Sequence, residues 1–488
     1  MTWGVLLRGG NLRRMAVLAG GVGLHAVNIF IVNTILPSVV AEIGGAAYYA
    51  WNTTLFVTAS IVGSAATVPA VRRLSTRGGY RLALVLFVLG SAVCAAAPSM
   101  AVLLAGRTLQ GGGGGMLVAL SFSAIRGLFP QPLWARAISL VSGMWGTAAL
   151  AGPFVGGVFA ELGSWRGAFW VLVPLVAAFV PLVERVIPRG TDPGEGGSLP
   201  WGRLSLLACA VLAISVGGMG EPGAAALGLA AGVVLTGLML RLDAAALHRL
   251  LPHRALDPRT PLGAAYATMA LLVVGTTTII FVPLILQVVH GLSPLTAGYL
   301  SVTESLAWTA AALSTSAAGP KAAARIVRTG PWLMAAGLAG LSLALARGPV
   351  PLAVVMMMLV GAGIGMVWAH LAALVMATAP SGERDLAASS ISTNQMIATA
   401  VGSALGGLTV NLAGLAEAVD AATVERAARW LFAAFAAAPA AAGLLALRLG
   451  SPPPPAGEPS AGEPSPAPAR QDRPWARSPR GVQGLRSK

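Results

Sequence analysis

Charged residues are scarce in this sequence. Only 10% of its 488 residues are Asp, Glu, Lys or Arg, and 56% are hydrophobic, whereas a soluble domain carries roughly 25% charged residues. So few charges cannot supply the solvated surface of a soluble fold of this length. The composition therefore excludes an ordinary soluble protein and indicates a protein embedded in a membrane.

Cysteines and nucleotide-binding motifs are also rare or missing. The two cysteines, Cys94 and Cys209, lie in separate apolar stretches with no His or Cys at ligand spacing, which argues against a disulfide framework and against a metal site. The sequence has no G-x-x-x-x-G-K-S/T motif and no soluble domain to house one. No loop is long or acidic enough for the clustered polar groups of an integral-membrane enzyme. We expect a protein that is not an enzyme, binds no cofactor or metal, and takes its energy from a gradient.

Long apolar stretches recur along the chain. A helix needs roughly 20 apolar residues to cross a hydrocarbon core of about 30 Å, and fourteen stretches of about 18 or more residues meet this need. They predict an all-α integral membrane protein with fourteen transmembrane helices. The predicted spans are 15–38, 50–70, 80–97, 101–123, 137–160, 168–187, 204–220, 224–241, 263–288, 295–317, 330–346, 351–378, 387–412 and 427–449.

A net charge of +15 could indicate a nucleic-acid partner. The positions of the Lys and Arg residues decide against it. With the N-terminus placed inside, most Lys and Arg residues fall in cytoplasmic segments, as the positive-inside rule requires. Arg107 lies within a span, and Arg166, Arg347, Arg426 and Arg429 fall outside. We therefore expect a multi-pass protein of the cell membrane, with both termini in the cytoplasm, lipid around it and no nucleic-acid partner.

The order of the spans predicts four parts. Residues 1–190 form an N-terminal six-helix bundle, 191–245 an inserted two-helix hairpin, 246–450 a C-terminal six-helix bundle, and 451–488 a proline-rich, basic cytoplasmic tail that we expect to be disordered. Each bundle has a short basic loop after its second helix, RRLSTRGGYR in the first and KAAARIVR in the second. These loops indicate a duplicated half, an arrangement in which transporters place the substrate near the midplane.

Ionisable residues inside the spans are candidates for function, because a charge at the bilayer centre is unfavourable by about 3 kcal/mol or more. Glu304 is the one acid well inside a span. Desolvation favours the protonated form of such a carboxyl, which can then load and release a proton as access alternates. Glu304 is therefore the main candidate for a proton carrier. The alternative is a protonated acid bonded to a neighbouring helix.

Arg107 and His25 are the other candidates for proton coupling. The guanidinium of Arg107 needs acceptors, which substrate, a protonatable group of another helix or backbone carbonyls can provide. His25 lies one helical turn before Asn28, so both side chains share a face, and imidazole can carry a proton near neutral pH. Alternatively, neighbouring polar groups satisfy His25. The sequence does not show whether Arg107 and Glu304 approach one another.

Further polar and aromatic residues inside the spans are candidates for lining a substrate cavity. Each polar one is equally consistent with interhelical hydrogen bonding, and each Trp with a place in the core or at the membrane interface. The candidates are Asn28, Asn33, Gln110, Trp145, Gln287, Trp308, Trp368 and His370. A wide cavity with few charges and many apolar walls suits hydrophobic substrates better than sugars or phosphates.

The run RTLQGGGGGMLVAL, residues 107–120, contains five consecutive glycines. It is not a phosphate-binding loop, because no Lys-Ser/Thr follows, and apolar sequence on both sides argues against a linker. In hydrocarbon an unpaired backbone amide costs more than a helical glycine, so the run is expected to be helical. The glycines would then form a smooth face for close helix contact.

Several motifs occur in an order that resembles one known family, over about residues 11–449. They are NIFIVNTILP at 28–37, RRLSTRGGYR at 72–81, R-x-x-Q-G-x-G at Arg107, Gln110, Gly111 and Gly113, G-P-x-x-G-G at Gly152, Pro153, Gly156 and Gly157, SWRGAF at 164–169 and LQVVHGLSPLTAG at 286–298. Together with the fourteen spans, they resemble the major facilitator superfamily, and specifically its fourteen-helix drug:proton antiporter branch.

The resemblance implies two six-helix bundles with an inserted two-helix hairpin, in a multidrug efflux transporter associated with antibiotic resistance. Such a protein exports small hydrophobic or cationic compounds by proton antiport with alternating access, and we expect it to be monomeric. The resemblance also assigns a cytoplasmic gating loop and an antiporter-motif seam, where proline kinks the helix and glycines admit a second backbone. The loop residues are Arg72, Arg73, Arg77, Gly79 and Arg81, and the seam residues are Gly152, Pro153, Gly156 and Gly157.

Three positions depart from the family pattern. Asn28 replaces the acid of the first helix, Thr76 replaces the acid of the loop, and Arg72 replaces that loop's first glycine. In the family the first acid is associated with proton coupling and the second with a charge network that holds one conformation. Neither role carries over to these residues. A uniporter or symporter of another small solute, or a transport-inactive sensor with the same fold, therefore remains an alternative.

Overall fold

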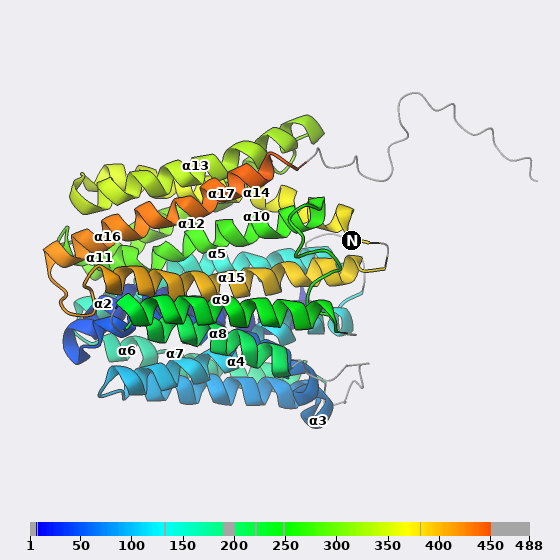
Figure 1. Ribbon diagram of the computed structural model, residues 1–488. Coiled ribbons are helices and arrows are strands. Elements are labelled where there is room, and N and C mark those ends of the chain that lie inside the picture. The colour runs from blue at the N-terminus through cyan, green and yellow to red at the C-terminus, as the bar shows by residue number, and fades with distance from the viewer. Residues whose placement is uncertain are drawn as a thin grey trace, which may run out of the picture. The chain divides into compact units, whose positions relative to one another are not determined.

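The computed structural model describes residues 6, 8–130, 133–188, 201–219, 222–246, 249–380 and 382–449. Within these residues all regular structure is helical, and none of it is β-strand. The long helices lie side by side (Figure 1). The predicted all-α fold is therefore confirmed, while the predicted tail, residues 451–488, lies outside the described part of the chain.

The N-terminal helices, a name used here for α2 to α7, cover the first six predicted spans. One element, α3, contains the second and third spans, because the helix resumes directly after a kink at Ser75, where φ is 69° and ψ is 167°. The elements are α2 Gly9–Ile43, η1 Ala46–Tyr48, α3 Trp51–Ala95, α4 Met100–Leu128, α5 Trp134–Glu161, α6 Trp165–Trp170 and α7 Leu172–Val186.

The C-terminal helices, α10 to α17, cover the last six predicted spans, and α8 with α9 forms the hairpin between the two sets. The ninth and fourteenth spans each consist of consecutive short helices. The elements are α8 Trp201–Gly217, α9 Pro222–Ala244, α10 Pro261–Thr276, η3 Thr277–Phe281, α11 Val282–Val288, α12 Pro294–Thr315, α13 Pro320–Arg347, α14 Val350–Thr378, α15 Arg384–Leu412, α16 Ala421–Phe435 and α17 Ala437–Ala446.

Length and hydropathy support a membrane protein more firmly than they support a particular count of crossings. Among the described residues, nine helical stretches are long and apolar enough to span a bilayer. Helices also lie over all fourteen predicted spans, although α4, α12 and α15 are not among these nine stretches and α8 is shorter. The count of fourteen crossings therefore stays a prediction.

The run of five glycines lies inside α4, as expected, and brings the backbone of α3 against it. A Cβ placed on Gly111 or Gly115 would collide with the backbone carbonyl oxygen of Phe56 or Ser60. A Cβ on Gly112 would have no neighbour within 4 Å. The glycines that face α3 are thus required by a backbone contact, because a neighbouring carbonyl cannot rotate away as a side chain can.

The other side of the run packs against two further segments. A Cβ on Gly113 would lie 2.5 Å from the carbonyl oxygen of Ala83, in the second half of α3, and one on Gly114 would lie 2.5 Å from Nδ1 of His25 in α2. One glycine-rich helix therefore contacts both halves of α3 and also α2. This close packing fixes where Arg107, at the start of the run, comes to lie.

The same contacts recur in the C-terminal helices. Gly361 and Gly365 of α14 lie against the backbone carbonyl oxygens of Glu304 and Trp308 of α12, with the spacing seen between α4 and α3. Gly363 lies between them and faces α13. The segments QGGGGGM in α4 and VGAGIGM in α14 thus have equivalent places in the two sets of helices, so the contacts support a structural duplication.

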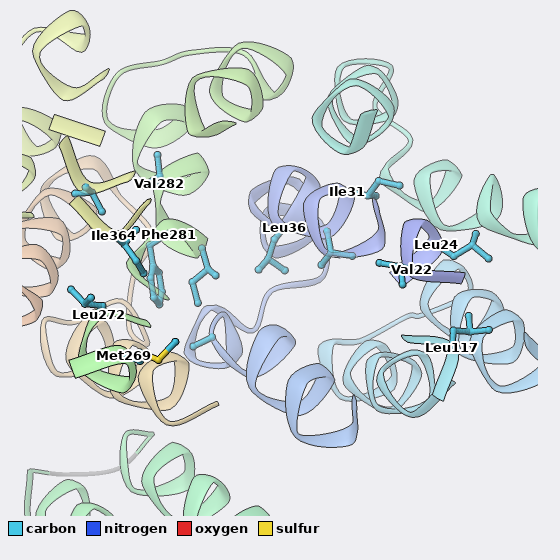
Figure 2. Close-up of a cluster of buried hydrophobic side chains, with 14 of the residues drawn as sticks. Val22, Leu24, Ile31, Leu36, Leu117, Met269, Leu272, Phe281, Val282 and Ile364 are labelled. Atoms are coloured by element: carbon cyan, nitrogen blue, oxygen red, sulfur yellow. The ribbon is translucent and has the colours of Figure 1, made fainter. Parts of the chain in front are cut away.

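The two sets of helices contact one another through α5 with α12, α3 with α15, and α2 with α11 and α12. The hairpin helix α8 packs against both α3 and α15. Buried apolar side chains form a cluster that includes Ile31 and Leu36 of α2 together with Leu272, Phe281 and Ile364 of the C-terminal helices (Figure 2). Apolar packing therefore continues across the contact between the two sets.

Candidate functional site

Arg107 is the centre of a buried polar cluster in the N-terminal helices. Its side chain is only 2% exposed. Its Nη1 donates hydrogen bonds to Oδ1 of Asn28 in α2 and to Oε1 of Gln110, 2.9 Å away in α4. Gln110 in turn donates to Oγ of Ser91, at 2.9 Å. Among the described residues, Arg107 therefore pairs with two neutral amide oxygens and not with a carboxylate.

Aromatic rings surround this cluster. The guanidinium carbon of Arg107 lies 4.1 Å from the centre of the Phe56 ring, in a cation–π contact. The His25 ring is stacked against Phe56 with centroids 5.1 Å apart, and Trp145 of α5 lies edge-on to His25 at 5.9 Å. Trp145 remains 41% exposed. Four helices thus contribute to one site that combines a cation, amides and aromatic rings.

Several polar atoms of the cluster have no partner. Nε of Arg107, Nδ2 of Asn28 and Nδ1 of His25 are all buried without a hydrogen bond to any described residue. Nδ1 of His25 faces Gly114, the glycine of α4 that packs against α2. Two of these three atoms are hydrogen-bond donors on side chains that already contact each other. The cluster therefore contains donors that the described part of the protein leaves without acceptors.

Glu304 lies in the C-terminal helices, on α12, and is 6% exposed. Within the described residues its carboxyl has no hydrogen-bond or ion-pair partner, and it makes no ion pair with Arg107. Asp243 is the other buried acid among these residues, but it is bound by Arg203 and by the backbone amides of Leu250 and Leu251. Glu304 is thus the buried acid that, in the described part of the chain, neither a base nor a backbone amide satisfies.

The remaining cavity candidates fall into separate places. Trp308, one helical turn after Glu304 on α12, contacts Trp368 of α14 with ring centroids 5.9 Å apart. Gln287 of α11 reaches the backbone oxygen of Thr34, at 3.5 Å. The last two cavity candidates, Asn33 on α2 and His370 on α14, are half-buried. Nε2 of His370 has no hydrogen-bond partner among the described residues. The structure therefore does not gather all predicted cavity residues into one site.

The G-P-x-x-G-G segment of α5 packs closely against two helices. Gly152 lies against Phe30 and Ile31 of α2, and Gly156 lies against Ile31. The next glycine, Gly157, faces the other way, where its Cβ would lie 2.6 Å from the Cα of Leu295 in α12. Glycine is needed because backbones or Cβ atoms occupy these places. The segment therefore joins α5 both to its own set of helices and to the opposite set.

Further contacts between the two sets lie at the same end of the helices as Gly157. Asn411 donates a hydrogen bond to the backbone oxygen of Ala47, at 2.9 Å. The Tyr49 ring is stacked against Phe281 with centroids 5.3 Å apart. Gly407 of α15 lies against Ala50, with 2.6 Å between its added Cβ and the Ala50 Cβ. This end, which carries the α2–α3 turn, is closed by contacts between segments far apart in sequence.

The basic loop between the two halves of α3 is held by α7. Nε of Arg81 lies 2.5 Å from Oε1 of Glu184, and Nη1 of Arg77 lies 3.5 Å from its other carboxylate oxygen. Arg77 also donates to the backbone oxygen of Ile187. Glu184 was not predicted from sequence, although the density of bases in this loop indicates a need for an acid. Phe56 was also missed, because nothing in its sequence context reveals that it covers Arg107.

The other residues predicted for this loop play different structural parts. Gly79 lies against Val71 and Leu120, with its added Cβ at least 3.3 Å away from both. Arg72 and Arg73 are both exposed. The gating role implied for all five loop residues is not visible from these contacts alone and stays a prediction.

Comparison with known proteins agrees with this geometry. The family model described as Major Facilitator Superfamily matches residues 18–346 and 264–485. A probable multidrug-efflux transporter of Mycobacterium tuberculosis strain CDC 1551 is 37% identical over 446 residues, which cover 88% of this chain and 92% of that protein. Multidrug resistance protein 3 of Bacillus subtilis is 27% identical over 41% of this chain and 39% of its own length.

Solved structures show the same fold. A bacterial homologue of the human lysosomal transporter Spinster, in an inward-facing and unoccupied conformation, aligns with a TM-score of 0.66 at 14% identity, over 91% of this chain and 97% of that one. The POT family transporter PepTSo aligns with a TM-score of 0.63 at 15% identity, over 90% of this chain and 98% of that one. With the family match and the helical architecture, these likenesses show that the chain belongs to the major facilitator superfamily and is a membrane transporter of small molecules rather than an enzyme.

Proposed function

We propose that this protein exports small hydrophobic or cationic compounds in exchange for protons, and that Glu304 carries the proton. The observation behind this proposal is the setting of Glu304: a buried carboxyl in the middle of α12 without an ion-pair or hydrogen-bond partner in the described residues. Burial disfavours the ionised form of a carboxyl that no base neutralises, so this group is suited to bind a proton, and it becomes a carrier if access to it alternates. The multidrug-efflux relative named above supports the direction of transport.

Alternating access is supported by contacts at one end of the helices. Gly157 with Leu295, Gly407 with Ala50, and Asn411 with Ala47 join the two sets of helices at the end that carries the α2–α3 turn. The positive-inside rule places this end outside, because the loops rich in arginine lie at the other end. We therefore propose that the structure represents an inward-facing state, in which the external end is closed.

Replacing Glu304 by Gln tests the proton-carrying role. Wild-type protein is purified and reconstituted into liposomes with an imposed pH gradient, and movement of a fluorescent hydrophobic cation is followed. We expect wild-type transport to collapse when the gradient is removed, and the Glu304→Gln variant to lose gradient-driven transport at least tenfold. Glu417→Gln, at an exposed position in the α15–α16 loop, is the matched control. Unchanged proton-coupled transport in Glu304→Gln would remove Glu304 from the mechanism.

A uniporter or symporter is the second candidate, because Asn28 and not an acid accepts the Arg107 hydrogen bond. For a uniporter, transport follows the substrate gradient, and collapse of the pH gradient leaves the transport rate unchanged. For a symporter, the pH gradient drives the substrate in the direction opposite to antiport. A transport-inactive sensor would bind probes and move none of them. The same liposome experiment therefore separates these alternatives from antiport.

The cellular setting is part of the proposal. We place the protein in the cell membrane as a monomer, with both termini in the cytoplasm, and as a member of the fourteen-helix antiporter branch that contributes to antibiotic resistance. Cysteine labelling of loop positions from either side of the membrane tests the orientation. Drug susceptibility of cells with and without the gene tests the contribution to resistance.

A further inference from the structure

The Arg107 cluster carries a positive charge that the protein does not balance. Both hydrogen-bond acceptors of the guanidinium are neutral amides, and its stacking partner is the neutral ring of Phe56. No acid of the described residues lies within ion-pair distance of it. A buried guanidinium without a countercharge is unfavourable by several kcal/mol after relaxation. A site of this kind gains more from an anion than from a cation.

The N-terminal helices contain no acid that could approach Arg107. Residues 1–188 include three acids, Glu42, Glu161 and Glu184. Each lies within two residues of the end of its helix, α2, α5 or α7. Glu42 is bound by Arg166 and Trp165, and Glu184 by Arg81 and Arg77. The interior of this set of helices is therefore electropositive by sequence, and no rearrangement within it supplies a carboxylate to Arg107.

The unpartnered atoms of the cluster fit an anion of one kind. Nε of Arg107 and Nδ2 of Asn28 are buried donors without acceptors among the described residues, and the two side chains are already bonded to each other. A buried unsatisfied donor costs about 1–3 kcal/mol. A carboxylate presents two acceptor oxygens in a plane and matches the donor geometry of arginine. It would satisfy donors that the protein leaves open.

The rings around the donors indicate what the carboxylate is attached to. His25 and Arg107 both lie against Phe56, and Trp145 meets His25 edge-on. Trp145, at 41% exposure, is the member of the group that a ligand reaches from outside the cluster. Aromatic pairs add about 0.5–1.5 kcal/mol beyond the burial of their area. The walls thus suit a flat, aromatic or otherwise apolar body.

We propose that the Arg107 cluster is a binding site for hydrophobic monocarboxylic acids, whose carboxylate is held by Arg107 and Asn28. This inference rests on the proposed efflux function and names hydrophobic acids as the class of its hydrophobic substrates that this site binds. In the free protein Asn28 and Gln110 shield the guanidinium, and the acid supplies the charge that these amides lack. Because Asn28 stands where the family pattern has an acid, no carboxylate at this position neutralises Arg107. The positive charge therefore remains available to a substrate.

Three probes that share one aromatic body test the proposal: 1-naphthoate, its neutral methyl ester, and protonated 1-naphthylmethylamine. Their binding to the purified full-length protein in detergent is measured by isothermal titration calorimetry. We expect wild type to bind the carboxylate at least tenfold more tightly than the ester or the amine. Equal or weaker binding of the carboxylate would overturn the inference.

The variant Asn28→Asp makes the test specific to charge. The new carboxylate pairs with Arg107, so we expect affinity for 1-naphthoate to fall at least tenfold and affinity for the amine to rise. Asn11→Asp adds the same charge at the start of α2 and is the control. Arg107→Gln should also lose naphthoate binding, and Asn28→Asp keeps the test valid if that variant fails to fold. Unaltered naphthoate affinity in Asn28→Asp would contradict the proposal.

Failure of the inference and failure of the proposed function give different results. If a pH gradient drives transport but the carboxylate binds no better than its ester, the function stands and the anion site is wrong. If the carboxylate preference and its loss in Asn28→Asp are seen but no probe moves with the gradient, the site stands and proton antiport is wrong.

Discussion

Phe56 and Glu304 occupy equivalent places in the two sets of helices. The backbone oxygen of Phe56 faces Gly111, the first glycine of the segment QGGGGGM in α4. The backbone oxygen of Glu304 faces Gly361, the first glycine of the segment VGAGIGM in α14. Phe56 covers the buried cation Arg107, whereas Glu304 supplies a buried acid. The duplicated scaffold thus carries opposite chemistry on its two sides, which separates the proposed proton carrier from the cationic site.

The close contact of α3 with α4 predicts a difference between two neighbouring glycines. Gly115→Ala places a methyl group against the backbone oxygen of Ser60, whereas Gly112→Ala places one in open space. Overpacking of this kind typically costs about 1–3 kcal/mol. We expect Gly115→Ala to lower the melting temperature in detergent, and Gly112→Ala to leave it unchanged or raise it. Equal stability of both variants would show that α3 does not lie so close.

Gly361→Ala is expected to impair coupling because its methyl group pushes on the backbone of Glu304. Proton-driven transport should fall severalfold, and the melting temperature should fall with it, because α12 and α14 must separate. The control is Gly319→Ala, whose methyl group meets no neighbour within 4 Å. Normal transport by Gly361→Ala in liposomes would argue against a close α12–α14 contact at Glu304.

A cysteine pair at Ala50 and Gly407 is expected to lock the closed end. The two Cβ positions are closer than the 3.5–4.5 Å of a relaxed disulfide, so a small separation of α3 and α15 allows the bond. With Cys94 and Cys209 replaced, oxidation should cross-link the double variant and stop transport, and a reducing agent should restore it. The two single-cysteine variants provide the controls. Full transport by the cross-linked protein would show that this end does not open during the cycle.

Glu184→Gln is expected to loosen the basic loop more than it destabilises the fold. The Arg81 side chain is 59% exposed, and ion pairs of exposed residues contribute about 0–1 kcal/mol. We therefore expect little change in melting temperature but faster trypsin cleavage after Arg77 and Arg81, which are partly shielded by this pairing. Glu161→Gln, at the exposed end of α5, serves as control. A cleavage rate equal to that of wild type would show that Glu184 does not hold the loop.

Sequence reasoning located the important residues individually but not their relations. Arg107 and Glu304 stand out because charges are rare in apolar spans, and the spacing of His25 and Asn28 places them on one face of a helix. The partner of Arg107 could not be predicted, because several polar residues on other helices were equally suitable. The aromatic cover provided by Phe56 depends on how closely α3 and α4 approach, which residue types alone do not reveal.

The sequence by itself determined the class of the fold and the helical state of its segments. Hydrocarbon gives a backbone amide no alternative to an internal hydrogen bond, so apolar stretches of this length form helices even through five glycines. Only the tertiary structure decided that Asn28 and Gln110 satisfy Arg107, that Glu304 has no partner among the described residues, and that Gly157 and Gly407 close one end. These relations join helices far apart in the chain, and their geometry is set by the packing of one helix surface on another, which no local pattern encodes.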